Sequence, residues 1–187
     1  MKRFGLVLLV AALCVVAARP AMAQRAMAQG GGLRYGVSAG LLMPIGDYGD
    51  ADKMGFVGGA GATYWLAGQP IGIRGDLSYS STSHDGVGAT GSTKLIGGMA
   101  SVVYALMPAS APARLMITGG VGYYSIDFGG GIAKQSKLGF GGGAAVAFKM
   151  GTGSTRLVVG TRYTSVSTDG TSRLNFLPIT VGLTFGK

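Results

Sequence analysis

The sequence predicts an all-β fold, an eight-stranded antiparallel up-and-down transmembrane β-barrel. Two observations predict it. Eight stretches alternate large apolar residues with small or polar ones, which is the period of a strand whose two faces meet different surroundings. A secretory leader precedes these stretches, so the chain is exported. In an exported chain, this pattern fits a barrel whose apolar face points outward into lipid better than a soluble barrel with an apolar interior.

The leader occupies the first residues of the chain. A basic dipeptide precedes an apolar run over residues 4–18, and small residues at 21–23 follow it. The run is too short to span a membrane as a helix, and the order of basic, apolar and small segments is that of a signal peptide. The predicted segments are a signal peptide over residues 1–23, a flexible Gly-rich segment over 24–32 and the barrel over 33–187, with cleavage after Ala23 or Ala28.

Composition excludes several kinds of protein. The single cysteine, Cys14, lies in the leader, so the mature chain has neither a disulfide framework nor thiolate chemistry. The formal net charge is +9, but lysine and arginine form no run and no helix is predicted to carry them, which argues against a nucleic-acid partner. Every acidic residue is aspartate, which indicates turns rather than helical surface.

The strands follow one another at short intervals along the chain. The eight predicted strands are residues 33–42, 56–66, 71–80, 93–106, 113–125, 137–149, 155–166 and 177–185. The first two carry apolar residues at alternate positions. The third is the clearest, because Ile73 and Leu77 lie on one face while Arg74 and Asp76 lie on the other.

The fourth strand is ambiguous, because both of its faces carry apolar residues. We favour the register in which five residues face lipid, namely Ile96, Ala100, Val102, Tyr104 and Leu106. The fifth and seventh strands set apolar residues opposite Arg114 and Arg156, and the sixth alternates apolar residues with glycine. In the eighth, every second residue from Leu177 to Phe185 is apolar, and we expect this strand to close the barrel by pairing with the first.

The connections between strands support the same fold. Those after the first, third, fifth and seventh strands have about 7–13 residues and the others about 4–6, as in barrels with long outer loops and short inner turns. This order places both chain termini on the periplasmic side. Several aromatic residues near strand ends suit interfacial girdles. They are Tyr64, Trp65, Tyr79, Tyr104, Tyr123 and Phe185, of which Trp65 needs a lumenal or interfacial position.

Charged residues collect on the face opposite the apolar one, which would line the barrel interior. They are Arg34, Arg74, Asp76, Arg114, Arg156 and Arg162. The interior of an eight-stranded barrel is just wide enough for side chains to fill it. We therefore expect a hydrogen-bonded lumenal polar network, with Asp76 paired to at least one guanidinium. The alternative interpretation is an anion path or a gated pore.

Three further motifs suggest chemistry only weakly. Residues 139–144 match the dinucleotide-binding pattern GxGxxA, but no helix follows and no acidic residue lies about 20 residues further on. His84 could serve a lipid-modifying enzyme, although neighbouring residues of one loop rarely form a catalytic triad. Asp47, Asp50 and Asp52 could gather a divalent cation, but their spacing is not that of a calcium loop. We predict no catalytic residue, no cofactor and no metal site.

The chain resembles the small outer-membrane β-barrels of bacteria of the OmpA and OmpX type. The resemblance rests on residues 44–48 (PIGDY), on Gly55-Phe56, on the eight alternating strands and on residues 178–185, and it covers residues 33–187. In that family the last strand is a recognition signal for the barrel-assembly machinery, which implies this role for Thr180, Gly182 and Phe185. The chain departs from the family in ending with Gly186-Lys187 rather than an aromatic residue.

Together these features predict a non-enzymatic protein of the bacterial outer membrane. We expect it to contribute to envelope integrity, or to adhere or bind through loops at residues 43–55, 81–92 and 126–136. The alternatives are a lipid-modifying barrel enzyme, a narrow pore and a soluble periplasmic lipid carrier. The expected partners are outer-membrane lipid and, during insertion, the barrel-assembly machinery, and the chain is expected to be a monomer.

Overall fold

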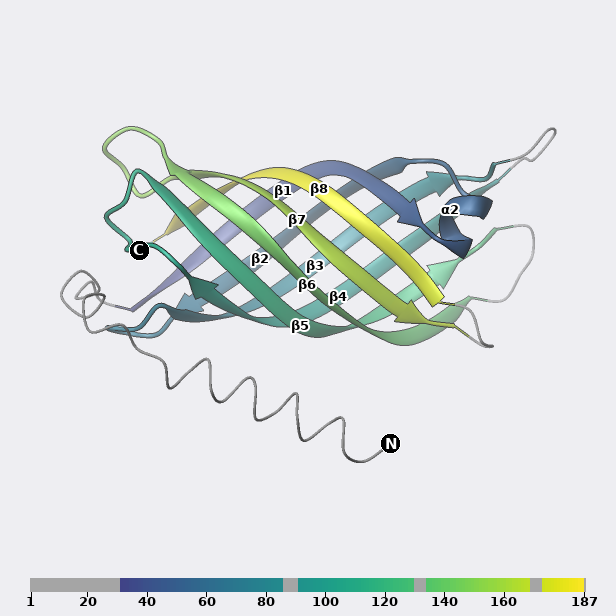
Figure 1. Ribbon diagram of the computed structural model, residues 1–187, viewed down its shortest axis with the longest axis horizontal. Helices are drawn as coiled ribbons and strands as arrows, with labels where there is room; N and C mark the ends of the chain where they lie inside the picture. Colours follow the sequence, from purple (N-terminus) through teal and green to yellow (C-terminus); the bar gives the residue numbers. More distant parts are fainter. Residues whose placement is uncertain (1–30, 86–90, 130–133, 169–172, 187) are drawn as a thin grey trace, which may run out of the picture.

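Eight antiparallel strands close on themselves to form a barrel (Figure 1). The computed structural model describes residues 31–85, 91–129, 134–168 and 173–186. The strands are β1 (Gly32–Ile45), β2 (Gly55–Trp65), β3 (Ile71–Ser83), β4 (Ser92–Ala105), β5 (Ala113–Asp127), β6 (Gln135–Lys149), β7 (Arg156–Ser167) and β8 (Arg173–Gly186). Each strand pairs with the next and β8 pairs with β1, so the predicted fold class is confirmed.

The described residues contain one short helix, α2 (Asp47–Ala51), between β1 and β2. No helix among them is both long enough and apolar enough to cross a membrane. The predicted signal peptide and the first part of the predicted flexible segment, residues 24–30, lie outside the described residues.

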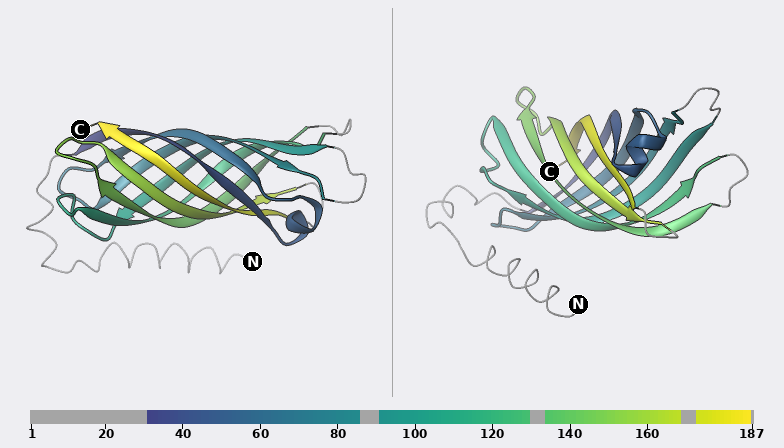
Figure 2. Two further views of the ribbon diagram at one scale, coloured as in Figure 1. Left: turned by 90° about the horizontal axis from the view of Figure 1, so that it is seen from above. Right: turned by 45° about the vertical axis from the view of Figure 1, so that its right-hand side comes forward.

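The two ends of the barrel differ (Figures 1 and 2). The connections after β1, β3, β5 and β7 meet at the end that carries α2, which we call the loop end. Because the number of strands is even, β1 begins and β8 finishes at the opposite end, which we call the terminal end. The strands run obliquely between the two ends, as barrel closure requires.

Closure depends on a long antiparallel pairing of β1 with β8. The register runs from Arg34 opposite Gly186 to Ile45 opposite Asn175, so it spans nearly the whole of both strands. On the outer face, Tyr35 lies opposite Phe185 with ring centroids 6.4 Å apart. The pairing removes the free strand edge that an open sheet would expose to lipid.

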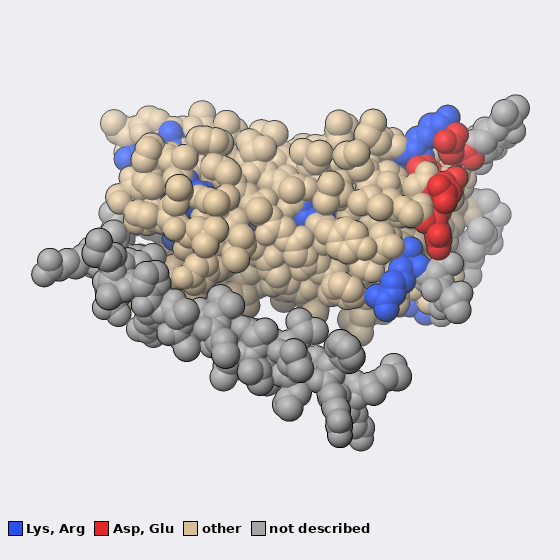
Figure 3. All heavy atoms as spheres, viewed as in Figure 1, with Lys and Arg blue, Asp and Glu red and all other residues tan. Residues whose placement is uncertain are grey.

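The barrel is apolar outside, as the alternation predicted. Ile73 and Leu77 keep 57% and 71% of their surface exposed, whereas Leu42 and Ile126, which point inward, keep at most 1%. In β4 the favoured register is confirmed, because Ile96 is exposed while its neighbour Leu95 is buried. On the face shown in Figure 3 the acidic side chains lie at the loop end, and the middle of the barrel surface is largely uncharged.

The predicted strand ends are wrong at the loop end, where several strands run further. β1 continues to Ile45, β3 to Ser83 and β5 to Asp127, and β8 starts at Arg173. The connections there are 46–54, 84–91, 128–134 and 168–172, against 66–70, 106–112 and 150–155 at the terminal end, so the expected sorting by length is largely absent. The apolar alternation marks the band that is expected to face lipid, whereas the hydrogen-bonded ladder continues beyond it.

We expect an arginine at the middle of the lipid-facing surface to destabilise the barrel strongly. Leu77 lies at the centre of β3 and faces outward, so Leu77→Arg should reduce the free energy of unfolding in phospholipid vesicles by about 2–4 kcal/mol. Met54 is similarly exposed but precedes β2 at the loop end, so Met54→Arg should change it by no more than about 0.5 kcal/mol. Denaturant titration measures both variants, and equal effects would contradict the lipid-facing assignment.

Candidate functional site

The half of the lumen nearest the loop end is filled by apolar side chains. They form one buried cluster, which we call the apolar plug: Leu42, Tyr48, Val57, Leu95, Tyr124, Ile126, Val166, Leu174 and Phe176. Ile126 and Val166 have no exposed surface, and the rings of Tyr124 and Phe176 meet edge to face with centroids 6.1 Å apart. The plug therefore combines side chains from β1, β2, β4, β5, β7 and β8 with Tyr48 from α2, and it packs this half of the lumen as a hydrophobic core.

A glycine on the neighbouring strand lets Tyr124 lie across the lumen. A Cβ atom on Gly97 of β4 would stand 2.4 Å from the Tyr124 ring, closer than real side chains approach one another. Gly97 and Tyr124 are directly opposite in the β4–β5 register. The absence of a side chain at Gly97 thus makes room for the aromatic ring that helps to fill the plug.

An ion-pair cluster crosses the middle of the lumen. Arg74 donates from Nε to Asp76 Oδ1 at 2.7 Å, and Arg162 Nη2 lies 3.3 Å from Asp76 Oδ2. Arg162 also points Nη1 toward Met99 Sδ at 3.0 Å. Arg74 and Asp76 lie on β3 and Arg162 on β7, which are diametrically opposite in an eight-stranded ring. We call Arg74, Asp76 and Arg162 the central ion-pair cluster.

Three more arginines gather toward the terminal end, and we call them the terminal arginine cluster: Arg34, Arg114 and Arg156. Arg34 Nη1 donates to Ser154 O at 2.9 Å, and Arg114 Nε donates to Met107 O at 3.2 Å. Arg156 donates to two carbonyls, those of Ala109 and Ala111. Within the described part of the chain, no carboxylate forms an ion pair with any of the three.

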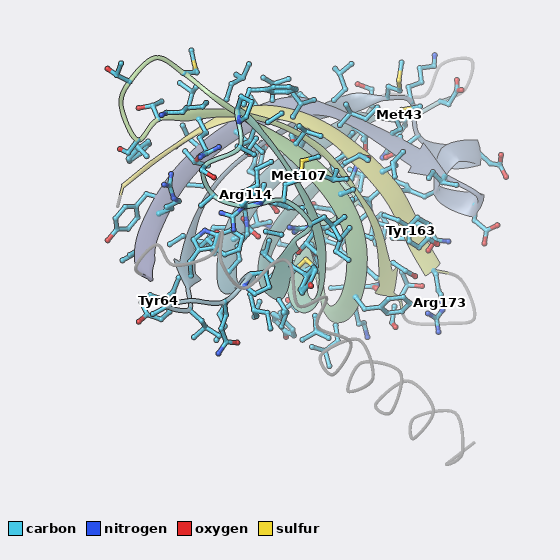
Figure 4. All side chains as sticks on the ribbon, turned by 60° about the vertical axis from the view of Figure 1, so that its left-hand side comes forward. Met43, Tyr64, Met107, Arg114, Tyr163 and Arg173 are labelled. Carbon is cyan, nitrogen blue, oxygen red and sulfur yellow. The ribbon has the colours of Figure 1, made fainter. Side chains whose placement is uncertain are left out.

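The lumen contains a cavity of about 200 Å³ that both arginine groups line. Figure 4 shows Arg114 inside the barrel, near the connection that carries Met107, and Arg173 at the other end. The Arg114 guanidinium carbon lies 4.0 Å from the centroid of the Trp65 ring, which is the cation–π distance. Trp65 therefore lies in the lumen, which is one of the two positions expected for it from its place in the second strand.

A second polar network lies at the loop end, beside the apolar plug. Thr82 donates its hydroxyl to Asp52 Oδ2 at 2.6 Å, and the Tyr48 hydroxyl is 2.8 Å from Thr82 Oγ1. Asp52 and His84 also form a one-residue antiparallel bridge. Burial, with Asp52 as a nearby negative charge, raises the pKa of Tyr48 to about 12. These contacts attach α2 and the residues after it to the ends of β3 and β4.

His84 has the neighbours of a catalytic triad but not its geometry. Its Nε2 atom lies 3.3 Å from Thr93 Oγ1 and 3.7 Å from Asp52 Oδ1. In a triad the imidazole uses one ring nitrogen toward the nucleophile and the other toward the acid. Here one nitrogen meets both partners, and the Thr93 side chain is buried away from any substrate. This arrangement cannot relay a proton in the way a triad does.

The other motifs lie where they have no ligand geometry. Residues 139–144 run within strand β6, without the helix that a dinucleotide pyrophosphate needs. Asp47 and Asp50 belong to α2, while Asp52 is directed into the Thr82 network. In the described ranges, no group of three or more His, Cys, Asp or Glu side chains could hold a metal ion.

Comparison with known proteins now places the chain. The sequence profile described as "Outer membrane protein beta-barrel domain" matches residues 8–185, which is most of the chain.

The chain belongs to this outer-membrane β-barrel family.

Its cellular location follows from that membership, and it is the bacterial outer membrane. None of the curated proteins compared with the chain matches its sequence.

Several solved structures share the fold of this outer-membrane barrel. Neisserial surface protein A has a TM-score of 0.64 and 18% identity, covering 85% of this chain and 100% of that one. The outer membrane protein OprG from Pseudomonas aeruginosa has a TM-score of 0.58 and 12% identity, covering 86% and 100%. The N-terminal β-barrel domain of Pseudomonas aeruginosa OprF has a TM-score of 0.53 and 13% identity, covering 82% and 97%. At these identities the likeness concerns the fold alone.

The residues singled out from the sequence fall into two separate groups within one lumen. All six, Arg34, Arg74, Asp76, Arg114, Arg156 and Arg162, line the cavity. Only the central three form ion pairs with one another. Sequence reasoning missed the apolar plug and the network of Tyr48, Asp52 and Thr82. Leu95 and Tyr124 lie within predicted strands, but an apolar residue on the inward face was not expected to pack with others into a plug, because the inward face was taken to be polar. The pairing of His84 with Asp52 is a long-range contact without a sequence signal.

Removing the lumenal carboxylate should destabilise the barrel far more than removing an exposed one. Asp76→Asn leaves Arg74 and Arg162 without a counter-charge inside the lumen, and we expect a loss of about 3–5 kcal/mol in the free energy of unfolding. Asp85→Asn is the matched control, because the Lys53–Asp85 pair is more than half exposed, and it should cost no more than about 1 kcal/mol. A small effect of Asp76→Asn would show that the central pairs contribute little.

Stability should fall at alkaline pH because of Tyr48. In the unfolded chain a tyrosine loses its proton near pH 10, whereas in the folded barrel Tyr48 keeps it until about pH 12. Ionisation therefore favours the unfolded state over that window, and the contribution is present below pH 10 and lost as pH rises. The loss amounts to at most about 2–3 kcal/mol. The unfolding free energy of wild type minus that of Tyr48→Phe should fall between pH 10 and 12, and a flat difference would refute this.

Proposed function

We propose that this outer-membrane barrel is a non-enzymatic, non-conducting protein that contributes to the integrity of the envelope. The apolar plug is the observation that carries the proposal, because apolar constrictions exclude water and ions. The central ion-pair cluster forms a second barrier on the terminal-end side of the plug, because the contact of Arg162 with Asp76 reaches across the lumen from β7 to β3. Two barriers in series argue against the narrow-pore alternative.

The geometry of His84 supports the non-enzymatic part of the proposal. A barrel enzyme acting on lipid needs a nucleophile and a base that a lipid can reach from the outer face. Thr93, the hydroxyl nearest to His84, is buried with 2% of its surface exposed. The contacts of His84 with Asp52 and Thr93 instead link the loop-end connections to the strands, which is a stabilising role.

The outer surface supports lipid as the main partner. A band of exposed apolar side chains surrounds the barrel, and charged side chains flank it at the loop end. Arg173 is one of these, and its guanidinium carbon lies 5.9 Å from the ring of the exposed Phe140. A cation at this height can meet lipid phosphates while its stem covers the aromatic ring. The closed sheet leaves no edge for pairing with another chain, which favours a monomer, and β8 is the segment we expect the barrel-assembly machinery to recognise.

The purified barrel should pass no current. Reconstituted in a planar lipid bilayer, it should give no stepwise conductance above that of the protein-free membrane, because the apolar plug stays dry. Folding is checked in the same sample by the different migration of unheated and boiled protein on a gel. Regular conductance steps from folded protein would refute the non-conducting assignment.

A strain that lacks the protein should show an envelope defect that does not depend on His84. We expect greater uptake of a hydrophobic dye after deletion, with recovery when wild type or His84→Ala is supplied. Lipid A analysed by mass spectrometry should be the same in all of these strains. Recovery with wild type but not with a folded His84→Ala protein would favour the enzyme alternative.

A further inference from the structure

The terminal arginine cluster carries positive charge that nothing described nearby neutralises. Arg114 and Arg156 keep only 9% and 8% of their surface exposed, so both guanidiniums are largely removed from water. The backbone carbonyls that they contact satisfy some N–H groups but bring no negative charge. Buried charges are normally paired, and a cluster of three like charges is costly without a counter-ion.

Donor groups in the cluster are left over after the hydrogen bonds to the connections. Arg156 uses both of its Nη atoms on Ala109 O and Ala111 O, so it acts mainly as a clamp on the 106–112 connection. Arg114 bonds Met107 O through Nε alone, and Arg34 bonds Ser154 O through Nη1 alone. The Nη edge of Arg114 and the remaining donors of Arg34 therefore have no protein acceptor among the described residues.

The space around these donors has the character of a binding site. The cavity of about 200 Å³ extends along the lumen, where all three arginines and Trp65 line one part of it and the central ion-pair cluster lines another. Trp65 stacks on Arg114 and holds its guanidinium plane in place. A water molecule occupies about 30 Å³ of liquid, so the cavity has room for a small anion with part of its hydration shell.

The position of the cluster favours access to this cavity from the terminal end. The apolar plug packs the lumen on the loop-end side of the arginines. Arg34 is less buried than the other two arginines of the cluster and lies near the start of β1, at the terminal end. An anion would therefore enter and leave through the terminal end and would not cross the membrane.

We propose that the terminal arginine cluster binds a small phosphate-bearing anion. Arginine forks match the oxygens of a phosphate group in a bidentate manner. Three cations suit a doubly charged oxyanion better than a single carboxylate, because a monoanion leaves more of the repulsion uncompensated. Bound phosphate would accept from the Nη edge of Arg114 and from Arg34, while Arg156 holds the connection over the site. This binding function is independent of the proposed structural role.

The single tryptophan of the chain makes the site directly observable. Trp65 lies against Arg114, so its fluorescence responds to changes at the cluster. We would fold the full mature chain into zwitterionic detergent micelles and titrate it with inorganic phosphate at constant ionic strength. The expected result is a saturable change in Trp65 emission, with acetate binding more weakly. A response no different from that to chloride would overturn the proposal.

Variants separate a built site from general attraction of anions. Arg34→Gln and Arg114→Gln should each weaken phosphate binding about ten- to a hundredfold, the loss expected for charged hydrogen bonds. Arg34→Gln leaves the contact between Arg114 and Trp65 in place, so the Trp65 fluorescence signal is retained in this variant. The proposal can therefore still be tested if Arg114→Gln folds poorly. Arg173→Gln is the matched control at the loop end and should bind as wild type does. Unchanged affinity in both cluster variants, or equal weakening in Arg173→Gln, would overturn the proposal.

Discussion

The hydrogen-bonded pairing of β8 with β1 is the constraint on which the rest of the structure depends. In hydrocarbon an unpaired backbone N–H or C=O group costs several kcal/mol, so a sheet must close before it can reside there. Closure with eight strands then fixes how narrow the interior is. In the closed barrel, alternate residues of each pleated strand point outward. The outward side chains contact lipid, so the large apolar residues have to be on that face. The polarity of the barrel therefore follows from its closure.

A narrow lumen has to be packed as a protein core is packed, and this barrel does so in layers along its axis. The apolar plug packs the lumen at the loop end, and the central ion-pair cluster pairs Arg74 and Arg162 with one carboxylate. Toward the terminal end the arginines bond backbone carbonyls of the connections instead. The described aspartates other than Asp76 lie in or beside the loop-end connections, so the lumenal surplus of positive charge is concentrated at the other end.

The fold was predictable because period-2 alternation repeats in eight segments, and even the ambiguous β4 was assigned correctly once Ile96 rather than Leu95 was put outside. The strand ends at the loop end were not predictable. Thr82 and Ile126 continue the hydrogen-bonded ladder beyond the lipid-facing band, where the outward residues need not be large and apolar. The interior was predictable as a list of inward charges but not as pairs. Which arginine meets Asp76 depends on β3 and β7 facing each other across the ring, a relation that only the closed structure supplies.

The same narrowness that argues against conduction makes anion binding at the terminal end physically reasonable. In an open pore, arginines would be hydrated and would pass anions on to the far side. Here the plug blocks the far side, and partial burial strips water from Arg114 and Arg156, so each guanidinium interacts more strongly with a counter-ion than it would in bulk solvent. A closed lumen with uncompensated charge therefore retains an anion and does not transport it. Binding without conduction is what we propose for this barrel, and the apolar plug is the feature on which both halves of that proposal depend.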